Sequence, residues 1–195
     1  KPHGGGGKHF CKGVVLSSFL TAVLAGVSSP SFAEQLPSTG PITSGNYEHT
    51  GNITVSSDSS VIDTTGDAGG SVTINISASD SENGNLDLDG VKEEGHTIWS
   101  ELDANEEIKI TAAGDVTIKA QGTNSGDNGD GINVTSGNKG SITVTADGSN
   151  TIIAESKQAD GIYTAEGSSG DVKLVSNGVS SDIGNIVNVE NNGID

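Results

Sequence analysis

Acidic side chains are the most numerous groups in this sequence that could take part in chemistry. The chain of 195 residues has 26 Asp and Glu residues. Three of them, Asp127, Asp130 and Asp160, stand beside turn-forming Gly or Asn residues. Glycoside hydrolysis requires a pair of facing carboxylates. No spacing in the sequence distinguishes one such pair, and we therefore expect these acids to be solvated residues at corners of the fold.

Other catalytic and metal-binding patterns are missing from the sequence. There is no Arg to act beside calcium-binding acids in β-elimination, and Gly167–Gly170 (GSSG) lacks the G-x-S-x-G spacing of a serine hydrolase. His49 and His96 follow no zinc-binding spacing and are expected at the surface. The segment Asp127–Gly131 resembles part of a calcium loop but lacks the Glu of an EF-hand. We therefore expect no catalytic residue, no metal site and no cofactor.

Two aromatic residues and an asparagine suggest binding instead. Trp99, Asn133 and Tyr163 each directly follow an Ile in a short β-branched run. Because side chains alternate across a strand, we expect these three on one outer face. Exposed aromatic rings can stack on sugar rings, which predicts a contact surface for a glycan or a receptor. The alternative is that the aromatic rings only cover the surface of their strands.

The elements that position these residues follow a ten-residue period. The apolar residues that begin successive runs are Leu88, Ile98, Ile108, Ile118, and then Ile132, Ile142, Ile152, Ile162 and Val172. The tripeptide Asp-Gly-Ile at 130–132 recurs at 160–162, which makes three units one thirty-residue repeat. Insertions at 79–85 and 122–130 shift the phase of the pattern without ending it. Periods of this length are typical of stacked architectures.

Stacking of these repeats predicts an all-β fold, a right-handed parallel β-helix with about three ten-residue strands per turn. Three units around a triangle can point their apolar residues inward, and the next turn pairs each strand with its equivalent at about 4.8 Å. We expect Ile132 beside Ile162 and Ile194, and Ile142 beside Val172. An antiparallel sandwich also has strands every 8–12 residues, but it gives no reason for a thirty-residue period.

The N-terminal segment has the pattern of an export signal. Lys8, His9 and Lys12 precede a mostly apolar stretch at 13–27, and the polar segment 28–33 places the small residues Ser31 and Ala33 at positions −3 and −1 of a cleavage point. This order of basic, apolar and small-residue regions is typical of secretory signal peptides. The apolar stretch is shorter than the roughly 20 residues that a membrane-spanning helix needs.

These features predict three regions and a location. We expect a helical signal peptide over 1–33 with cleavage between Ala33 and Glu34, an irregular lead-in over 34–48, and β-helix repeats over 49–195. The protein is then exported and lies at the cell surface, in the outer membrane or outside the cell. The one cysteine of the chain falls within the signal, so a disulfide framework is excluded.

The charge of the chain limits its partners. The net charge is -17, and there is no Arg. Residues 1–33 hold three of the nine Lys and no acid, so the remainder has 26 acids against six Lys, a net charge of -20. Nucleic-acid binding needs a basic patch, and we therefore expect no nucleic-acid partner.

An export signal followed by Gly-, Asn- and Asp-rich repeats resembles the passenger domains of Gram-negative autotransporter adhesins. The motifs that carry the resemblance are DGIY (160–163), GDVTI (114–118), GSITV (140–144) and NTIIAES (150–156). The resemblance implies a non-enzymatic adhesive or structural segment. Its partners would be glycans or proteins of host or bacterial cell surfaces, or further copies of itself. Membrane contact would come only through a C-terminal β-barrel beyond residue 195.

Other functions fit the same architecture. Secretion domains of two-partner systems also form β-helices, but no NPNG- or NPNL-like motif occurs in this sequence. The main alternative is the N-terminal part of a secreted β-helical carbohydrate-active enzyme whose active residues lie further along the chain. A third is a component of a surface layer or fibre.

Overall fold

The computed structural model describes residues 33–67, 69–90, 96–121, 129–155 and 159–178, together with the backbone of 185–189 and 192–194. They belong to a compact unit, Phe32–Asp195. The predicted signal peptide, apart from its last residue, lies outside the described residues. No helix in the described part is long and apolar enough to cross a membrane.

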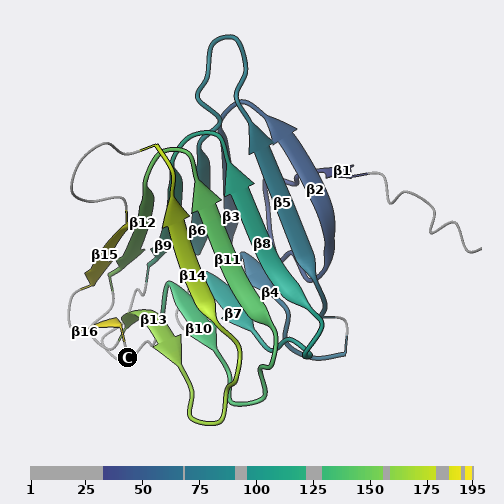
Figure 1. Cartoon of the computed structure of the whole chain (residues 1–195), viewed down its shortest axis with the longest axis vertical. Helices are drawn as coiled ribbons and strands as arrows, with labels where there is room; N and C mark the ends of the chain where they lie inside the picture. The colour runs from purple at the N-terminus through teal and green to yellow at the C-terminus, as the bar shows by residue number, and fades with distance from the viewer. Residues whose placement is uncertain are drawn as a thin grey trace, which may run out of the picture. The chain divides into compact units, whose positions relative to one another are not determined.

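Three parallel β-sheets make up the described chain (Figure 1). Sheet A contains β1 (Glu34–Gln35), β2 (Gly45–Thr50), β5 (Val72–Ser77), β8 (Glu107–Ala112), β11 (Ser141–Ala146) and β14 (Val172–Ser176). Sheet B contains β3 (Ile53–Ser57), β6 (Leu86–Gly90), β9 (Val116–Ala120), β12 (Asn150–Ala154) and β15 (Asn185–Val189). Sheet C contains β4 (Ile62–Asp63), β7 (Ile98–Ser100), β10 (Ile132–Val134), β13 (Asp160–Thr164) and β16 (Asn192–Ile194). One strand from each sheet in succession makes one coil of a parallel β-solenoid, as the sequence predicted.

The strand register agrees with the predicted stacking. Ile132 pairs with Ile162, Ile162 pairs with Ile194, and Ile142 pairs with Val172. Like residues therefore lie beside like along the axis of the solenoid. This register keeps the apolar side chains of successive coils in contact, since a slip of one residue would turn every side chain to the other face.

The length of a coil varies while the register is kept. Ile132 pairs with Ile162, thirty residues later, but Ile98 pairs with Ile132, thirty-four residues later. Val72 and Ile108 pair at a separation of thirty-six residues. The predicted insertion at 79–85 lies between β5 and β6, which confirms that extra residues are placed in the links between strands. Pairing and core contacts thus set the register, and the links absorb the difference in length.

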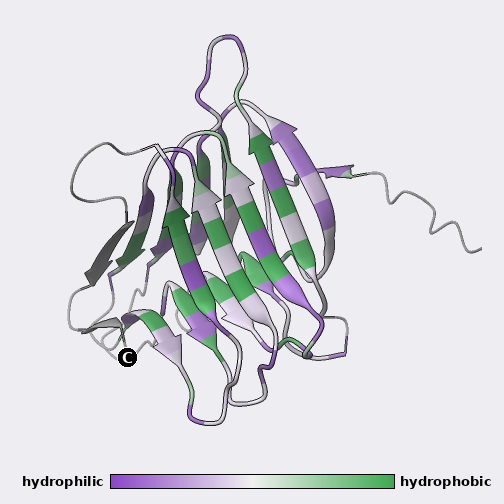
Figure 2. Ribbon diagram, in the orientation of Figure 1, coloured by the Kyte–Doolittle hydropathy of each residue, from purple (hydrophilic) through white to green (hydrophobic). Residues whose placement is uncertain are grey.

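The core runs through the middle of the three sheets. Figure 2 shows apolar residues as bands across neighbouring strands, alternating with polar ones. The largest fully buried side chains are Ile42, Ile62, Ile74, Leu86, Leu88, Ile98, Leu102, Ile108, Ile110, Ile118, Ile132 and Ile142. Burial of each stabilises the fold by about 1.5–3 kcal/mol relative to exposure. The largest buried side chains are thus all aliphatic, and Tyr47 packs against them from the edge of the core.

The segment predicted as an irregular lead-in, 34–48, is part of the solenoid. Its strand β1 pairs with β2 along the edge of sheet A. Further on, Thr39 bridges to Ser56 of β3 and Ile42 bridges to Ile62 of β4. The segment therefore covers the first edge of all three sheets, where unpaired backbone groups would otherwise be open to other chains.

The predicted start of the repeats at residue 49 is consequently too late. β2 begins at Gly45, and Leu36 and Ile42 are buried in the core. Pro37 and Pro41 interrupt the alternation of apolar and polar residues in this segment, which hid its strand character. Its pairing with the following coil becomes visible only in three dimensions.

The corner between sheets A and B is built from a ladder of polar side chains. Asn52, Asn85 and Asp115 each precede the first residue of a sheet B strand. The Asn52 side-chain oxygen accepts a hydrogen bond from the Asn85 backbone N–H (2.9 Å), and that of Asn85 accepts one from Asp115 (2.9 Å). Asp115 Oδ1 in turn accepts from the Ser149 N–H (2.7 Å). Each side chain thus satisfies the backbone donor at the same position one coil later.

Candidate binding face on sheet C

The structure brings the three predicted contact residues together on sheet C. Asn133 of β10 pairs with Trp99 of β7 on one side and with Tyr163 of β13 on the other. Asp63 of β4 pairs with Trp99 and extends the row by one strand. The predicted alignment of the row is confirmed, and we call these four residues the sheet C row.

The members of the sheet C row differ in exposure. Trp99 and Tyr163 are half-buried, with part of each side chain open to solvent. Asn133 is only 8% exposed, so little of its side chain is open to solvent. Its amide is withdrawn because Nδ2 donates a hydrogen bond to Asp130 Oδ2 at 2.7 Å. The row is therefore two partly open rings on either side of a recessed amide.

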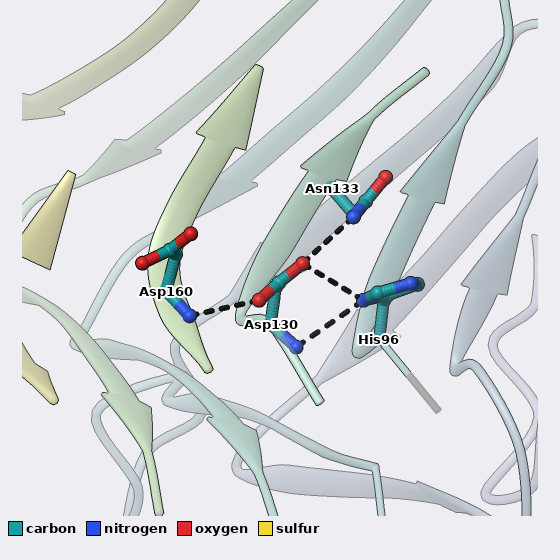
Figure 3. A network of polar contacts seen from close by, with 4 residues as sticks. All are labelled: His96, Asp130, Asn133 and Asp160. Carbon is teal, nitrogen blue, oxygen red and sulfur yellow. Dashed lines mark hydrogen bonds and ion pairs between the residues drawn. The ribbon is translucent and has the colours of Figure 1, made fainter. Parts of the chain in front are cut away.

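Asp130 is the centre of a polar network that includes Asn133 of the row (Figure 3). Its Oδ1 accepts a hydrogen bond from the backbone N–H of Asp160 at 2.8 Å, and its Oδ2 accepts from Asn133. Oδ2 also lies 3.1 Å from His96 Nδ1. Both carboxylate oxygens are thus engaged, which a carboxylate that is only 4% exposed requires.

His96 meets Asp130 through a single nitrogen in two ways. The Asp130 backbone N–H points to His96 Nδ1 at 3.2 Å, while the carboxylate lies at 3.1 Å from the same atom. When Nδ1 carries no proton, it accepts from the backbone N–H. When it carries one, it donates to the carboxylate. His96 therefore has an Asp130 partner in either state.

His96 also connects the network to the surface. Its ring packs against the Trp99 ring with the centroids 5.4 Å apart and the planes at 64°, an edge-to-face arrangement. Such contacts favour one orientation of the two rings. Asp130 thereby positions Asn133 directly and Trp99 through His96. Asp130 also accepts a hydrogen bond from Asp160 at the start of β13, the strand that contains Tyr163.

Two expectations about these residues need correction, those for the two acids and for His96. Asp130 and Asp160 were predicted to be solvated corner acids, but they are 4% and 7% exposed. His96 was predicted at the surface, but its side chain is only 13% exposed. His49 is half-buried and accepts a hydrogen bond from Gln35 at 2.8 Å. Asp127 lies outside the described residues.

The buried polar residues share one place in the repeat. His96, Asp130 and Asp160 each stand two residues before a buried Ile of sheet C. Asp130 bonds to the outward-facing Asn133 and His96 packs on Trp99, so their burial does not follow from the two-residue period of a strand. Their polar character predicted solvated turns. The DGI repeat therefore marks a buried corner as well as a repeat unit.

Asp130, the most connected acid, has both oxygens occupied by neighbours. Within the described part of the chain, no group of three or more His, Cys, Asp or Glu residues is arranged to hold a metal ion. At the predicted cleavage point, Ala33 and Glu34 are exposed.

Comparisons of the chain with protein-family models, curated proteins and solved structures found no match.

Proposed function

We propose that this chain is an adhesive segment of an exported, surface-displayed protein of the autotransporter passenger type, without enzymatic activity. The observation that carries the proposal is the sheet C row, in which two partly exposed aromatic residues stand on either side of Asn133, which is bonded to a buried polar network. Aromatic residues with one open face are characteristic anchors of binding surfaces. The N-terminal signal pattern supports export.

The placement of the row on strands supports a binding role. Trp99, Asn133 and Tyr163 lie on three hydrogen-bonded neighbours of one sheet. Residues on such elements are fixed more closely than residues on loops, so little conformational freedom is lost when a ligand binds. A solenoid also extends a surface along its axis, which suits adhesion to repetitive partners.

The alternative is a carbohydrate-active enzyme, in which Asp130 and Asp160 would be the candidate pair of carboxylates. Asp130 and Asp160 occupy equivalent positions on neighbouring coils and are joined by a hydrogen bond. However, Asp130 is buried and bonded to three neighbours, which favours a structural role. A general acid or nucleophile must reach the glycosidic bond. We therefore place the binding function first.

Adhesion assays with matched variants test the proposal. The full chain would be coupled to beads and tested on bacterial cells, epithelial cells and glycan arrays. We expect binding to fall at least tenfold in Trp99→Ala and Tyr163→Ala, because each loses an aromatic anchor. Thr143→Ala on the outer face of sheet A is the control and should bind as the parent does. Equal binding by the parent and both aromatic variants would overturn the proposal.

A further inference from the structure

The spacing of the sheet C row defines the shape of a ligand. Trp99 and Tyr163 lie on either side of Asn133, one strand away in each direction. Neighbouring strands are about 4.8 Å apart, so the two aromatic positions are separated by roughly 9.6 Å along the solenoid axis. A ligand that touches both rings must therefore be elongated and must run across the strands.

The chemistry of the row alternates between apolar and polar contacts. Trp99 and Tyr163 offer partly open rings, against which the C–H face of a pyranose can stack. Between them, Asn133 has its Nδ2 committed to Asp130. Figure 3 shows its oxygen directed away from Asp130. Because this Oδ1 accepts no hydrogen bond from any described residue, it remains available to a ligand hydroxyl group.

The charge around the row favours a neutral ligand. Asp63 belongs to the row, Asp130 is bonded to Asn133 of the row, and Asp160 is on the same strand as Tyr163. The described lysines lie elsewhere, on β8, β9 and β14 and between β10 and β11. Three carboxylates against one histidine make the local field negative, and groups within about 8 Å act on a ligand with little screening. A sugar that carries a carboxylate or sulfate is repelled.

From these three features we infer that the row binds a linear chain of neutral pyranose sugars aligned with the solenoid axis. One ring stacks on Trp99, the next donates a hydroxyl hydrogen bond to Asn133 Oδ1, and a third stacks on Tyr163. This inference rests on the proposed binding function and adds the ligand class and its direction.

The single tryptophan of the chain provides a direct readout. Trp99 emission would be followed while the full chain is titrated with cellotriose, with galactotriose and with trigalacturonate, which differs from galactotriose in its carboxylates. We expect a neutral trisaccharide to shift the emission and trigalacturonate to leave it unchanged. Glucose and galactose should bind at least tenfold more weakly than the trisaccharides, because a single ring reaches one aromatic residue.

Variants assign each contact. Tyr163→Ala should weaken trisaccharide binding about tenfold and leave monosaccharide binding unchanged, since it removes the second stacking ring. Asn133→Ala should weaken both neutral trisaccharides, and its circular dichroism spectrum reports whether the strands persist. Lys173→Ala on β14 is the control for a change of surface charge.

The outcomes separate this inference from the proposed function. If cell or glycan binding depends on Trp99 but trigalacturonate binds as well as galactotriose, the ligand class is wrong and the adhesive function stands. If trisaccharides and monosaccharides bind equally, the axial alignment is wrong. If no sugar shifts Trp99 emission and Trp99→Ala adheres like the parent, both are wrong.

Discussion

Two corners of the solenoid use the same device with different results. Between sheets A and B, the side chains of Asn52 and Asn85 accept the backbone N–H one coil later. Between sheets B and C, His96 accepts from the Asp130 N–H and Asp130 accepts from the Asp160 N–H. In both places a polar side chain closes the gap between coils by satisfying a backbone donor.

The two ladders differ in burial and in their further contacts. Asn52 and Asp115 are exposed, and they bond mainly to the backbone. Asp130 is buried, and its carboxylate also reaches Asn133 and His96, which packs on Trp99. We therefore expect a corner position that only links two coils to tolerate many residue types. A corner position that also orients surface residues should tolerate few, because each of its contacts must be kept.

Removing the central acid of each ladder should give the largest contrast. Asp130→Ala leaves the Asp160 N–H and the Asn133 amide without their acceptor in a buried site, which we expect to lower the free energy of unfolding by about 3 kcal/mol. Asp115→Ala exposes its donors to water and should cost about 1 kcal/mol. Urea unfolding followed by circular dichroism measures both. Equal losses would contradict the distinction between the corners.

Glycines beside the two ladders should differ in the same direction. A Cβ on Gly131 would meet Ile152 Cγ2 and would lie 2.7 Å from the Gly161 carbonyl oxygen, which a neighbouring strand holds in place. We expect Gly131→Ala to destabilise by about 2–3 kcal/mol. A Cβ on Gly148 would meet the Asp115 carboxylate and would lie 3.1 Å from the Gly114 backbone carbon. The exposed carboxylate can rotate away, but it then gives up its hydrogen bonds from Ser149. Gly148→Ala should therefore cost about 1 kcal/mol or less in a thermal unfolding assay.

An exchange of acid for amide sharpens the comparison further. In Asp130→Asn, the new NH₂ replaces an acceptor oxygen and faces another donor, either the Asp160 N–H or the Asn133 NH₂. We expect the free energy of unfolding to fall by about 2 kcal/mol. In Asp115→Asn, Oδ1 can keep its two bonds to Ser149 while the NH₂ takes the other position. Stability should then change by less than about 0.5 kcal/mol. If Asp130→Asn has the same free energy of unfolding as the parent in urea, the second carboxylate oxygen of Asp130 does not stabilise the fold.

Among the changes at the buried corner, the smallest loss of stability is expected at His96. His96→Ala removes the acceptor of the Asp130 N–H and the ring contact to Trp99, which should cost about 1–2 kcal/mol. Trp99 emission should move to longer wavelength as the ring gains solvent. Asn52→Ala, the matched change in the other ladder, should leave Trp99 emission unchanged. If Trp99 emission in His96→Ala is the same as in the parent, His96 does not position Trp99.

Much of the binding row was predictable because it depends on local periodicity. The alternation after Ile98, Ile132 and Ile162 placed three residues on one face, and the structure pairs them as expected. The same reasoning did not predict the buried network of His96, Asp130 and Asp160 that contacts them. Polar residues such as Asp130 resemble turn residues in a sequence, and burial depends on what the neighbouring coils place around them.

The sequence by itself determined the all-β solenoid, the equivalence of residues such as Ile142 and Val172, and the position of Asn133 between Trp99 and Tyr163. These follow from a repeat that is written along the chain. Only the tertiary structure decided that the segment before residue 45 covers the sheet edges and that Asp130 is a buried hub. Both depend on contacts between coils some thirty residues apart, where burial and hydrogen bonding are set by neighbours in space.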